Sequence, residues 1–257
     1  MDNFKILLKK NLLEITRTKK WIVFMVVLPL IAIASSVIVK VLFTALSPFL
    51  AELGIAYDPT IADAYIQFIA NMAETGYLLI AIMFSTVLIK EKTSSTYYIL
   101  KSNGVKESEV VLAHFVSKIL LITISYLVSV IAFVITNLIL FKSYAGLRGV
   151  ISIGFTYMLL VFALCFSMFI SSIISKKGQG YIITIASYFG FSILYLIPKV
   201  GVVTPFYALT LLNDVMYETT YNISEIVTNG VSLLIMCAGL IWGSIYFFGN
   251  KVDNGKS

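Results

Sequence analysis

The stretch WIVFMVVLPLIAIASSVIVKVLFTAL, residues 21–46, decides the fold of this chain, because Lys40 is its one charged residue. A helix that crosses the hydrocarbon core of a bilayer needs roughly 20 mostly apolar residues. Five further stretches also meet this requirement: residues 65–89, 118–141, 150–174, 181–203 and 227–248. The sequence therefore predicts an all-α integral membrane protein with six transmembrane helices, in a single transmembrane domain over residues 1–257.

The composition of the whole chain agrees with this prediction. Hydrophobic residues make up 59% of the chain and charged residues 12%, and the mean hydropathy is +0.95. Soluble domains carry about 25% charged residues, so this chain has too little polar surface to cover a water-soluble globule. The same numbers exclude the collagen-like, disordered and disulfide-scaffold classes.

The basic residues predict which ends of the spans face the cytoplasm. If the N-terminus is cytoplasmic, the cytoplasmic segments hold fifteen of the nineteen basic residues, and the outer side keeps Lys40, Lys142, Arg148 and Lys199. Lys and Arg are enriched in cytoplasmic loops. We therefore expect both termini in the cytoplasm and a multi-pass protein of the bacterial plasma membrane. The net charge of +6 is then a topology signal and does not indicate a nucleic-acid partner.

Residues 1–20 are predicted to form a helix before the first span. Their apolar side chains recur at spacings of three and four, which is typical of an amphipathic helix: Phe4, Leu7, Leu8, Leu12 and Ile15. Such a helix would lie in the cytoplasmic interface, with its lysines among anionic lipid headgroups. The alternative is a basic leader that only sets the topology.

The cytoplasmic loop and the beginning of the third span occupy residues 90–117. Ser94 or Ser95 can cap a short helix, which Asn103-Gly104 would end. Ser108 can cap the next helix, which continues into the third span. That helix is longer than a bilayer requires, so we expect it to begin below the membrane surface.

The side chains needed for catalysis or metal binding are few. The chain has one histidine, His114, and two cysteines, Cys165 and Cys237, which lie far apart in apolar runs. This is too few converging ligands for a metal site. The motif Gly255-Lys256-Ser257 lacks the helix that would have to follow a phosphate-binding loop. We therefore expect no catalytic, cofactor-binding or metal-binding residue in this chain, and no ATP hydrolysis by the chain alone.

Polar residues interrupt the outer half of the second span. Gln67, Asn71 and Glu74 share one face of the predicted helix, and Lys40 of the first span reaches a similar depth. An unpaired charge in hydrocarbon is unfavourable. Two interpretations remain open: an ion pair between Lys40 and Glu74, or a polar patch that meets cargo in a central cavity.

Short motifs of the 90–117 loop occur in a recognisable order: Glu91-Lys92, Thr96, Ile99-Leu100, Gly104-Val105 and Leu112. In this order they resemble the loop of the permease subunits of type-2 ABC exporters, although Ser95 stands where that family usually has Gly. The predicted outer segment, residues 204–226, opens with Thr204-Pro205-Phe206-Tyr207. This is similar to the family's Pro-containing segment before the sixth span, so the resemblance covers nearly the whole chain.

The resemblance implies a pair of permeases, homo- or heterodimeric, docked on two copies of a cytoplasmic ABC ATPase subunit that binds ATP and Mg²⁺. It also implies that the loop helix is a coupling helix seated in a cleft of the ATPase. The residues expected at that interface are Glu91, Lys92, Thr96, Tyr97, Tyr98, Ile99 and Leu100. The spans hold few fixed charges, which predicts a hydrophobic or amphipathic cargo moved outward. A peptide is favoured by the loose resemblance to bacterial toxin and antimicrobial-peptide exporters.

Two other classes of membrane protein are compatible with the spans. A secondary transporter or channel subunit would need no ATPase, and is expected to have intramembrane charges, broken helices and internal repeats. The sequence has no clear repeat, and Glu74 is its one clearly intramembrane carboxylate. A membrane scaffold or immunity protein that transports nothing is the third alternative.

Overall fold

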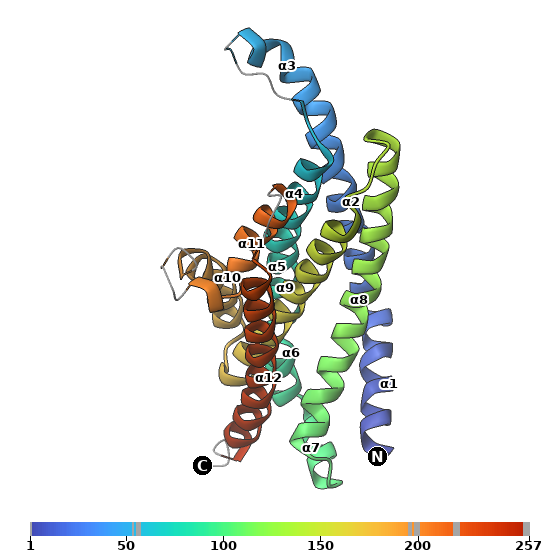
Figure 1. Ribbon diagram of the computed structural model, residues 1–257. Coiled ribbons are helices and arrows are strands. Elements are labelled where there is room, and N and C mark those ends of the chain that lie inside the picture. The colour runs from blue at the N-terminus through green and yellow to red at the C-terminus, as the bar shows by residue number, and fades with distance from the viewer. Residues whose placement is uncertain are drawn as a thin grey trace.

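The computed structural model describes residues 2–52, 54, 58–194, 197, 201–217 and 222–253. All regular secondary structure in this part of the chain is helical (Figure 1). In chain order, the elements are α1 (Asp2–Arg17), α2 (Lys20–Val37), η1 (Ile38–Leu42), α3 (Phe43–Glu52), α4 (Ile61–Asn71), η2 (Met72–Gly76), α5 (Tyr77–Phe84), α6 (Val87–Lys92), α7 (Ser95–Ser102), α8 (Glu107–Leu140), α9 (Gly146–Ile173), α10 (Lys177–Leu194), η3 (Gly201–Val203), α11 (Tyr207–Tyr217) and α12 (Ile223–Asp253). The elements η1 and η2 are π-helices, and η3 is a 3₁₀ turn.

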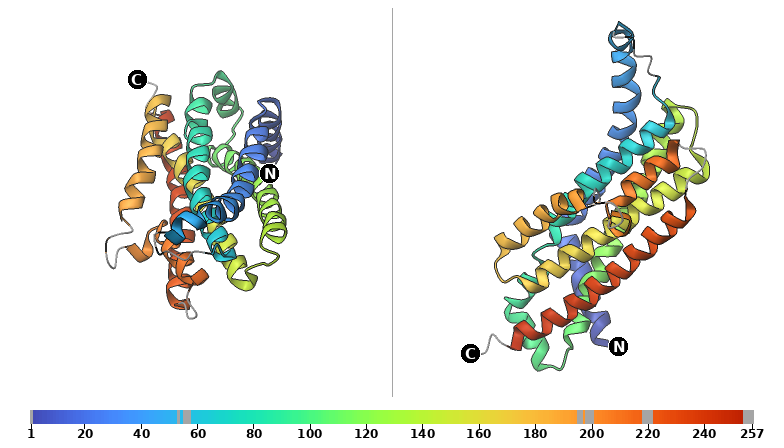
Figure 2. Two further views of the ribbon diagram at one scale, coloured as in Figure 1. Left: turned by 90° about the horizontal axis from the view of Figure 1, so that it is seen from above. Right: turned by 60° about the vertical axis from the view of Figure 1, so that its left-hand side comes forward.

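Five helical stretches in the described residues are long and apolar enough to cross a membrane: Lys20–Glu52, Ile61–Lys92, Glu107–Leu140, Gly146–Ile173 and Ile223–Gly249. Each overlaps one of the predicted spans, so the prediction of long apolar helices is confirmed at these five places. The helix α9 is central, because it contacts α4, α5, α6, α8, α10, α11 and α12. On the other side of the bundle, α2 lies along α8 and also contacts α4 (Figures 1 and 2).

The predicted fifth span, residues 181–203, is not one continuous helix. The helix α10 ends at Leu194, and Gly201–Val203 forms a 3₁₀ turn. Pro198, between these two elements, lacks an amide hydrogen and disfavours helical backbone at the residue before it. The helix α10 is also not among the five membrane-length stretches found in the described residues. A sixth span is therefore not shown.

The predicted outer segment, residues 204–226, contains a helix that packs within the bundle. This helix, α11, contacts α4, α9 and α12. The turn before α11 is held by Asn229 of α12, whose Nδ2 donates hydrogen bonds to the carbonyl oxygens of Val202 at 2.8 Å and Thr204 at 2.9 Å. Since Asn229 and Thr204 are buried, this segment fills space inside the bundle beside α4.

The long helix α8 begins at Glu107, close to the predicted start, but its cap differs from the prediction. The carboxylate of Glu109 accepts a hydrogen bond from the backbone N–H of Lys106 at 3.1 Å. Ser108 lies inside the first turn and does not cap it. A carboxylate in the first helical turn can reach back to the preceding N–H group, and this makes a serine cap at position 108 unnecessary.

The first helix, α1, includes most of the residues of the predicted 1–20 helix. It packs against other helices of the chain, whereas the prediction placed its apolar side against lipid. It lies alongside the lower part of α8 (Figure 1), and Leu7, Asn11 and Ile15 are buried there. The apolar period over Leu7 and Ile15 therefore serves helix packing. Leu12, predicted to share their lipid-facing side, is exposed.

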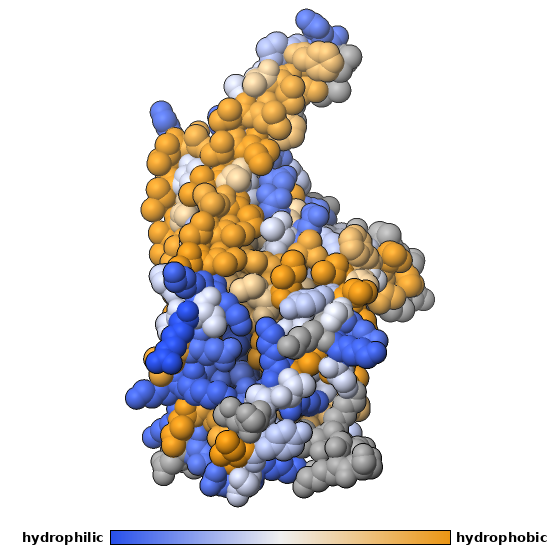
Figure 3. Space-filling view, turned by 180° about the vertical axis from the view of Figure 1, so that it is seen from behind, coloured by the Kyte–Doolittle hydropathy of each residue, from blue (hydrophilic) through white to orange (hydrophobic). Residues whose placement is uncertain are grey.

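Polar and apolar surfaces separate along the molecule. The start of α1, the helix α7 and the end of α12 lie at one end, which we call the basal end (Figure 1). Seen from behind, hydrophobic residues cover α3 and much of the upper half, whereas hydrophilic residues gather over the basal half (Figure 3). The predicted 90–117 loop therefore lies at the hydrophilic end of the bundle.

Candidate functional site

The helical stretch that begins at Ile61 is interrupted just before the basal loop. A serine of α9 accepts hydrogen bonds from backbone N–H groups at this interruption. Helix α5 ends at Phe84, and α6 starts at Val87. The first N–H groups of a new helix have no partner within it. Here the Ser171 hydroxyl accepts hydrogen bonds from the N–H groups of Leu88 at 2.9 Å and Ile89 at 3.2 Å. The short helix α6 is thus attached to α9 at its first turn.

The next helix, α7, has the caps that the sequence predicts. The Ser94 hydroxyl accepts a hydrogen bond from the N–H of Tyr97 at 3.3 Å. At the other end, Gly104 has a φ of 77°, and the N–H of Val105 donates to the carbonyl of Leu100 at 3.1 Å. Glycine adopts this left-handed conformation without steric cost, which is why it commonly ends helices. The prediction of a short helix closed by Asn103-Gly104 is confirmed.

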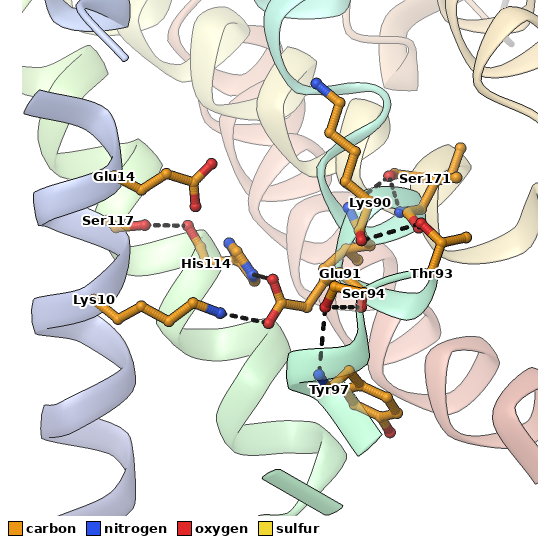
Figure 4. Close-up of polar contacts among 12 residues, drawn as sticks. Lys10, Glu14, Lys90, Glu91, Thr93, Ser94, Tyr97, His114, Ser117 and Ser171 are labelled. Carbon is orange, nitrogen blue, oxygen red and sulfur yellow. Dashed lines mark hydrogen bonds and ion pairs between the residues drawn. The ribbon is translucent and has the colours of Figure 1, made fainter. Parts of the chain in front are cut away.

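A buried ionic cluster ties α6 to two other helices. One carboxylate oxygen of Glu91 lies 2.6 Å from Lys10 Nζ of α1, and the other lies 3.3 Å from His114 Nε2 of α8. The Glu91 and His114 side chains are only 9% and 3% exposed, whereas Lys10 is 36% exposed. Figure 4 shows Lys10 and His114 approaching the Glu91 carboxylate from two different helices, α1 and α8. We call Lys10, Glu91 and His114 the Glu91 cluster.

Polar groups around the Glu91 cluster extend into the same interface. Lys118, one helical turn after His114, is buried and its Nζ donates to Ser117 Oγ at 3.3 Å. Asn11, one residue after Lys10, is buried as well. Asn11 Oδ1 and His114 Nδ1 have no hydrogen-bond partner among the described residues. The contact of α1 with α8 is therefore unusually polar for a buried helix–helix interface.

Aromatic and cationic contacts attach α6 and α7 to the last helix. The Tyr97 ring lies edge-on to Phe248 of α12, with 5.3 Å between the ring centroids. Lys92 Nζ lies 5.0 Å from the centroid of the same ring, and also donates to the carbonyl of Ser172 in α9. Since Phe248 is fully buried, these contacts hold the α6–α7 segment firmly against α12.

The structure divides the predicted interface into two groups. Tyr98 and Ile99 are 58% and 61% exposed, and Leu100 is half-buried. Three other predicted contact residues point into the bundle: Glu91, Lys92 and Tyr97. The side chain of Thr96 lies outside the described residues. The inward group already has partners within the chain, so Tyr98 and Ile99 are the expected interface residues that the structure leaves exposed.

The predicted polar patch of the second span is partly assembled. Gln67 Nε2 donates to Asn71 Oδ1 at 3.0 Å, and Asn71 Nδ2 donates to Ser35 Oγ of α2 at 2.9 Å. Lys40 does not join them, because its Nζ lies over the ring of Phe141, 5.4 Å from the centroid. Glu74 is exposed. Lys40 and Glu74, both in the described part of the chain, form no ion pair, so that prediction is wrong.

No local pattern in the sequence indicates the Glu91 cluster. Lys10 and Glu91 are 81 residues apart, and His114 comes from a third segment of the chain. One signal was present: a single histidine and a lysine four residues later, on the buried face of a long helix. Polar side chains at this spacing share a helix face, and a buried face with such residues requires partners from another helix.

Comparisons of the sequence with other proteins add nothing to this picture. No protein-family model matches the chain, and no curated protein shows significant similarity to it. Within the described residues there is also no group of three or more His, Cys, Asp or Glu that could hold a metal ion.

Proposed function

We propose that this chain is the membrane-spanning permease subunit of an ATP-driven ABC exporter whose ATPase is a separate polypeptide. One observation carries the proposal: α7 exposes Tyr98 and Ile99 at the basal end, while the α6–α7 segment is tied to α1, α8, α9 and α12. Exposed aromatic and aliphatic side chains on a rigid element are typical anchors of protein interfaces.

The contacts of this segment would let it act as a lever. A cytoplasmic ATPase that closes on ATP and Mg²⁺ would press on α7 through Tyr98 and Ile99. Because Glu91 is bound to both α1 and α8, a displacement of α6 would move both helices with it. Rigid movement of helices between two packed arrangements is a common way to open and close a transport path.

The proposed assembly contains two permeases and two ATPase subunits in a bacterial plasma membrane, with both termini cytoplasmic. A hydrophobic or amphipathic cargo, such as a peptide, would move outward. A shallow apolar groove of about 320 Å³, open to the surface, is compatible with this cargo class; it is lined by Phe162, Phe166, Phe191, Met236, Gly239 and Leu240. Apolar and aromatic side chains of this kind contribute most of the contacts to hydrophobic ligands.

A secondary transporter is the second candidate function, and two observations favour it. The helix α10 ends at Leu194 and Gly201–Val203 is a 3₁₀ turn, where a continuous span was predicted, and Glu74 is a charged residue in the interior of a membrane-length stretch. Broken helices and intramembrane charges are common in secondary transporters. Under this alternative, transport would follow an ion gradient and would not depend on ATP.

Photo-crosslinking at the basal end tests the proposal. A photoreactive amino acid at position 98 should crosslink an ATPase with a phosphate-binding loop in native membranes of the source organism. Tyr144 is the matched control, because it is at least as exposed as Tyr98 but follows the end of α8 that lies away from the basal end. We also expect Tyr98→Ala with Ile99→Ala to reduce ATP-dependent transport at least tenfold while membrane insertion is unchanged. Full ATP-dependent transport by this double variant, or an ATPase crosslinked equally from position 144, would contradict the proposal.

A further inference from the structure

The helix α1 is joined to the rest of the chain by a short and strained connection. It ends at Arg17, α2 begins at Lys20, and Lys19 between them has a φ of 54°. A left-handed backbone is unfavourable for a residue that carries a side chain. Beyond this connection, α1 is held mainly by its contact with α8. The position of α1 therefore depends on the strength of the α1–α8 contact.

This contact combines a small apolar part with several polar groups. Leu7 and Ile15 are buried there, and Asn11 between them is 1% exposed. Asn11 Oδ1 has no hydrogen-bond partner among the described residues, and neither does Nδ1 of His114. Buried polar atoms without partners weaken an interface. The polar groups thus make α1 easier to detach than an apolar helix of the same length.

The Glu91 cluster places one carboxylate between a cation and a group that can become a cation. Glu91 Oε1 lies 2.6 Å from Lys10 Nζ, and Glu91 Oε2 lies 3.3 Å from His114 Nε2. When the imidazole is uncharged, Lys10 balances the charge of Glu91, and this ties α1 to α6. A charged imidazolium would compete with Lys10 for the same carboxylate.

The other charged groups around His114 make a second buried cation unfavourable. Lys118 lies one turn later on the same face of α8; it is 2% exposed and donates to the hydroxyl of Ser117, a neutral partner. Figure 4 shows Glu14 of α1 pointing toward the same region, and its carboxylate lies 4.0 Å from Lys20 of α2. Burial and nearby positive charge both disfavour a charged imidazole. The docked position of α1 therefore favours an uncharged His114.

A second position for α1 is available in the membrane interface. The apolar period of α1 is typical of a helix that lies among lipid headgroups. Its outward face also carries the exposed residues Lys5 and Lys9 beside Leu12 and Leu13. A released α1 would place its apolar side chains against lipid, and water would reach the polar groups of α8 that α1 now covers.

We propose that His114 is a proton-operated switch: when its imidazole takes up a proton from water, Glu91 pairs with His114 in place of Lys10, and α1 separates from α8. One carboxylate does not balance both cations, so the tie to α1 is the one that is lost. The switch needs no ATPase and would work in an exporter or in a secondary transporter. In the proposed exporter, it would make the joint movement of α1 and α6 respond to the acidity of the cytoplasm.

The direction of the pH dependence follows from the two environments of His114. In the released state the imidazole is in water, where histidine titrates near about pH 6.5. In the docked state the added charge is disfavoured. Docking is therefore strongest above about pH 6.5, and it weakens below this value by up to about tenfold per pH unit. The chain has one histidine, so a single substitution removes the imidazole response.

Distance measurements by double electron–electron resonance test the switch in the purified full-length chain in detergent. Nitroxide labels at Lys5 of α1 and Ile124 of α8, both exposed, report the separation, with the free cysteines Cys165 and Cys237 replaced by alanine. From about pH 7.5 to about pH 5.5, we expect the ratio of released to docked α1 to rise about tenfold. His114→Gln keeps a polar side chain that takes up no proton, and it should give the same ratio at both pH values.

A second measurement makes the test independent of this variant. NMR of isotope-labelled histidine follows the protonation of His114 in the wild type, and its midpoint should coincide with the midpoint of the distance change. Lys10→Met should raise the released fraction already at neutral pH, because the tie to Glu91 is lost, whereas Lys9→Met at an exposed position should not.

Three results would overturn the switch: an unchanged distance in the wild type over this pH range, a pH response that persists in His114→Gln, or midpoints that differ by more than about one pH unit. An equal released fraction in the Lys10 and Lys9 variants would also contradict it. None of these results bears on whether position 98 crosslinks an ATPase, so the switch and the proposed exporter can fail separately.

Discussion

Glu91 and Glu74 belong to the same membrane-length stretch, Ile61–Lys92, but their environments are opposite. Glu91 is buried at the basal end, where Lys10 and His114 contact both of its oxygens. Glu74 is exposed in η2 and has no cationic partner among the described residues. The comparison separates a carboxylate that joins helices within the chain from one that is exposed and has no cationic partner in the described residues.

The difference follows from the helices that surround each residue. The break between α5 and α6 directs Glu91 toward the interface of α1 with α8, where a lysine and a histidine are available. A buried carboxylate is tolerated only when it is paired and hydrogen-bonded. Lys40, which the sequence suggested as a partner for Glu74, instead lies over the ring of Phe141 at the end of α8. Identical side chains of one membrane-length stretch can therefore lie in opposite environments, one paired and buried and the other exposed.

The largest expected difference between the two residues is in protein stability, when each carboxylate is removed separately. We expect Glu91→Ala to lower the free energy of unfolding in detergent by about 3 kcal/mol, near the lower end of the range for a broken buried ion pair, because Lys10 is partly solvated. Glu74→Gln should leave the unfolding temperature unchanged, since no contact within the chain is lost. Thermal unfolding followed by circular dichroism measures both.

The isosteric variant Glu91→Gln is the control for the first of these changes. It keeps the volume and one hydrogen bond, so its effect should be clearly smaller than that of Glu91→Ala. An unfolding temperature that falls more in Glu74→Gln than in Glu91→Ala would reverse the assignment of the two residues.

The two partners of Glu91 should contribute unequally. His114→Leu is expected to lower the stability by about 2 kcal/mol, because a buried hydrogen bond to a charged group is lost while the volume is kept. Lys10→Met should cost about 1 kcal/mol or less, as is typical of ion pairs that reach solvent. The measurement is again thermal unfolding, with Lys9→Met as the control for a loss of charge on an exposed position of α1. Equal losses in the His114 and Lys10 variants would contradict the burial difference between them.

The sequence predicted those elements that local signals determine. Long apolar runs located the five membrane-length helices, and Ser94 with Asn103-Gly104 located α7, because caps and apolar length act within a few residues. The predicted fifth span, residues 181–203, is not one continuous helix, because apolar composition alone does not distinguish one helix from two shorter elements. Asn229 could not be recognised as the residue that holds the turn before α11, since this contact joins residues 25 and 27 positions apart.

In the candidate site, contacts between residues far apart in the chain were again not predictable, and more of the site depends on them. The sequence correctly suggested that the 90–117 loop has a short exposed helix, and Tyr98 and Ile99 are exposed as an interface requires. It did not reveal that Glu91 and Tyr97 point inward, because this depends on α1, α8 and α12 meeting at the basal end. The direction of Lys40 was likewise not predictable, since the π-helix η1 changes the order of side chains around the axis.

A pair of double-mutant cycles gives the smallest expected effect and the sharpest comparison. For Lys10 and Glu91, which are in direct contact, we expect a coupling energy of about 1 kcal/mol, since the loss of one partner removes most of what the other contributes. For Lys40 and Glu74 the losses of Lys40→Met and Glu74→Gln should add, with a coupling energy below about 0.5 kcal/mol, because Lys40 contacts Phe141 and Glu74 is open.

The Lys40–Glu74 cycle is informative because its result depends on the direction of the side chains and not on how near the two helices lie. If η1 and η2 direct the two charges apart, Lys40→Met should have the same effect in the wild type and in Glu74→Gln. A coupling energy above about 1 kcal/mol would mean that Lys40 turns back to neutralise Glu74 in the purified protein. In that case Glu74 would have an internal partner, as Glu91 does, and the contrast between the two carboxylates would reduce to a difference in burial.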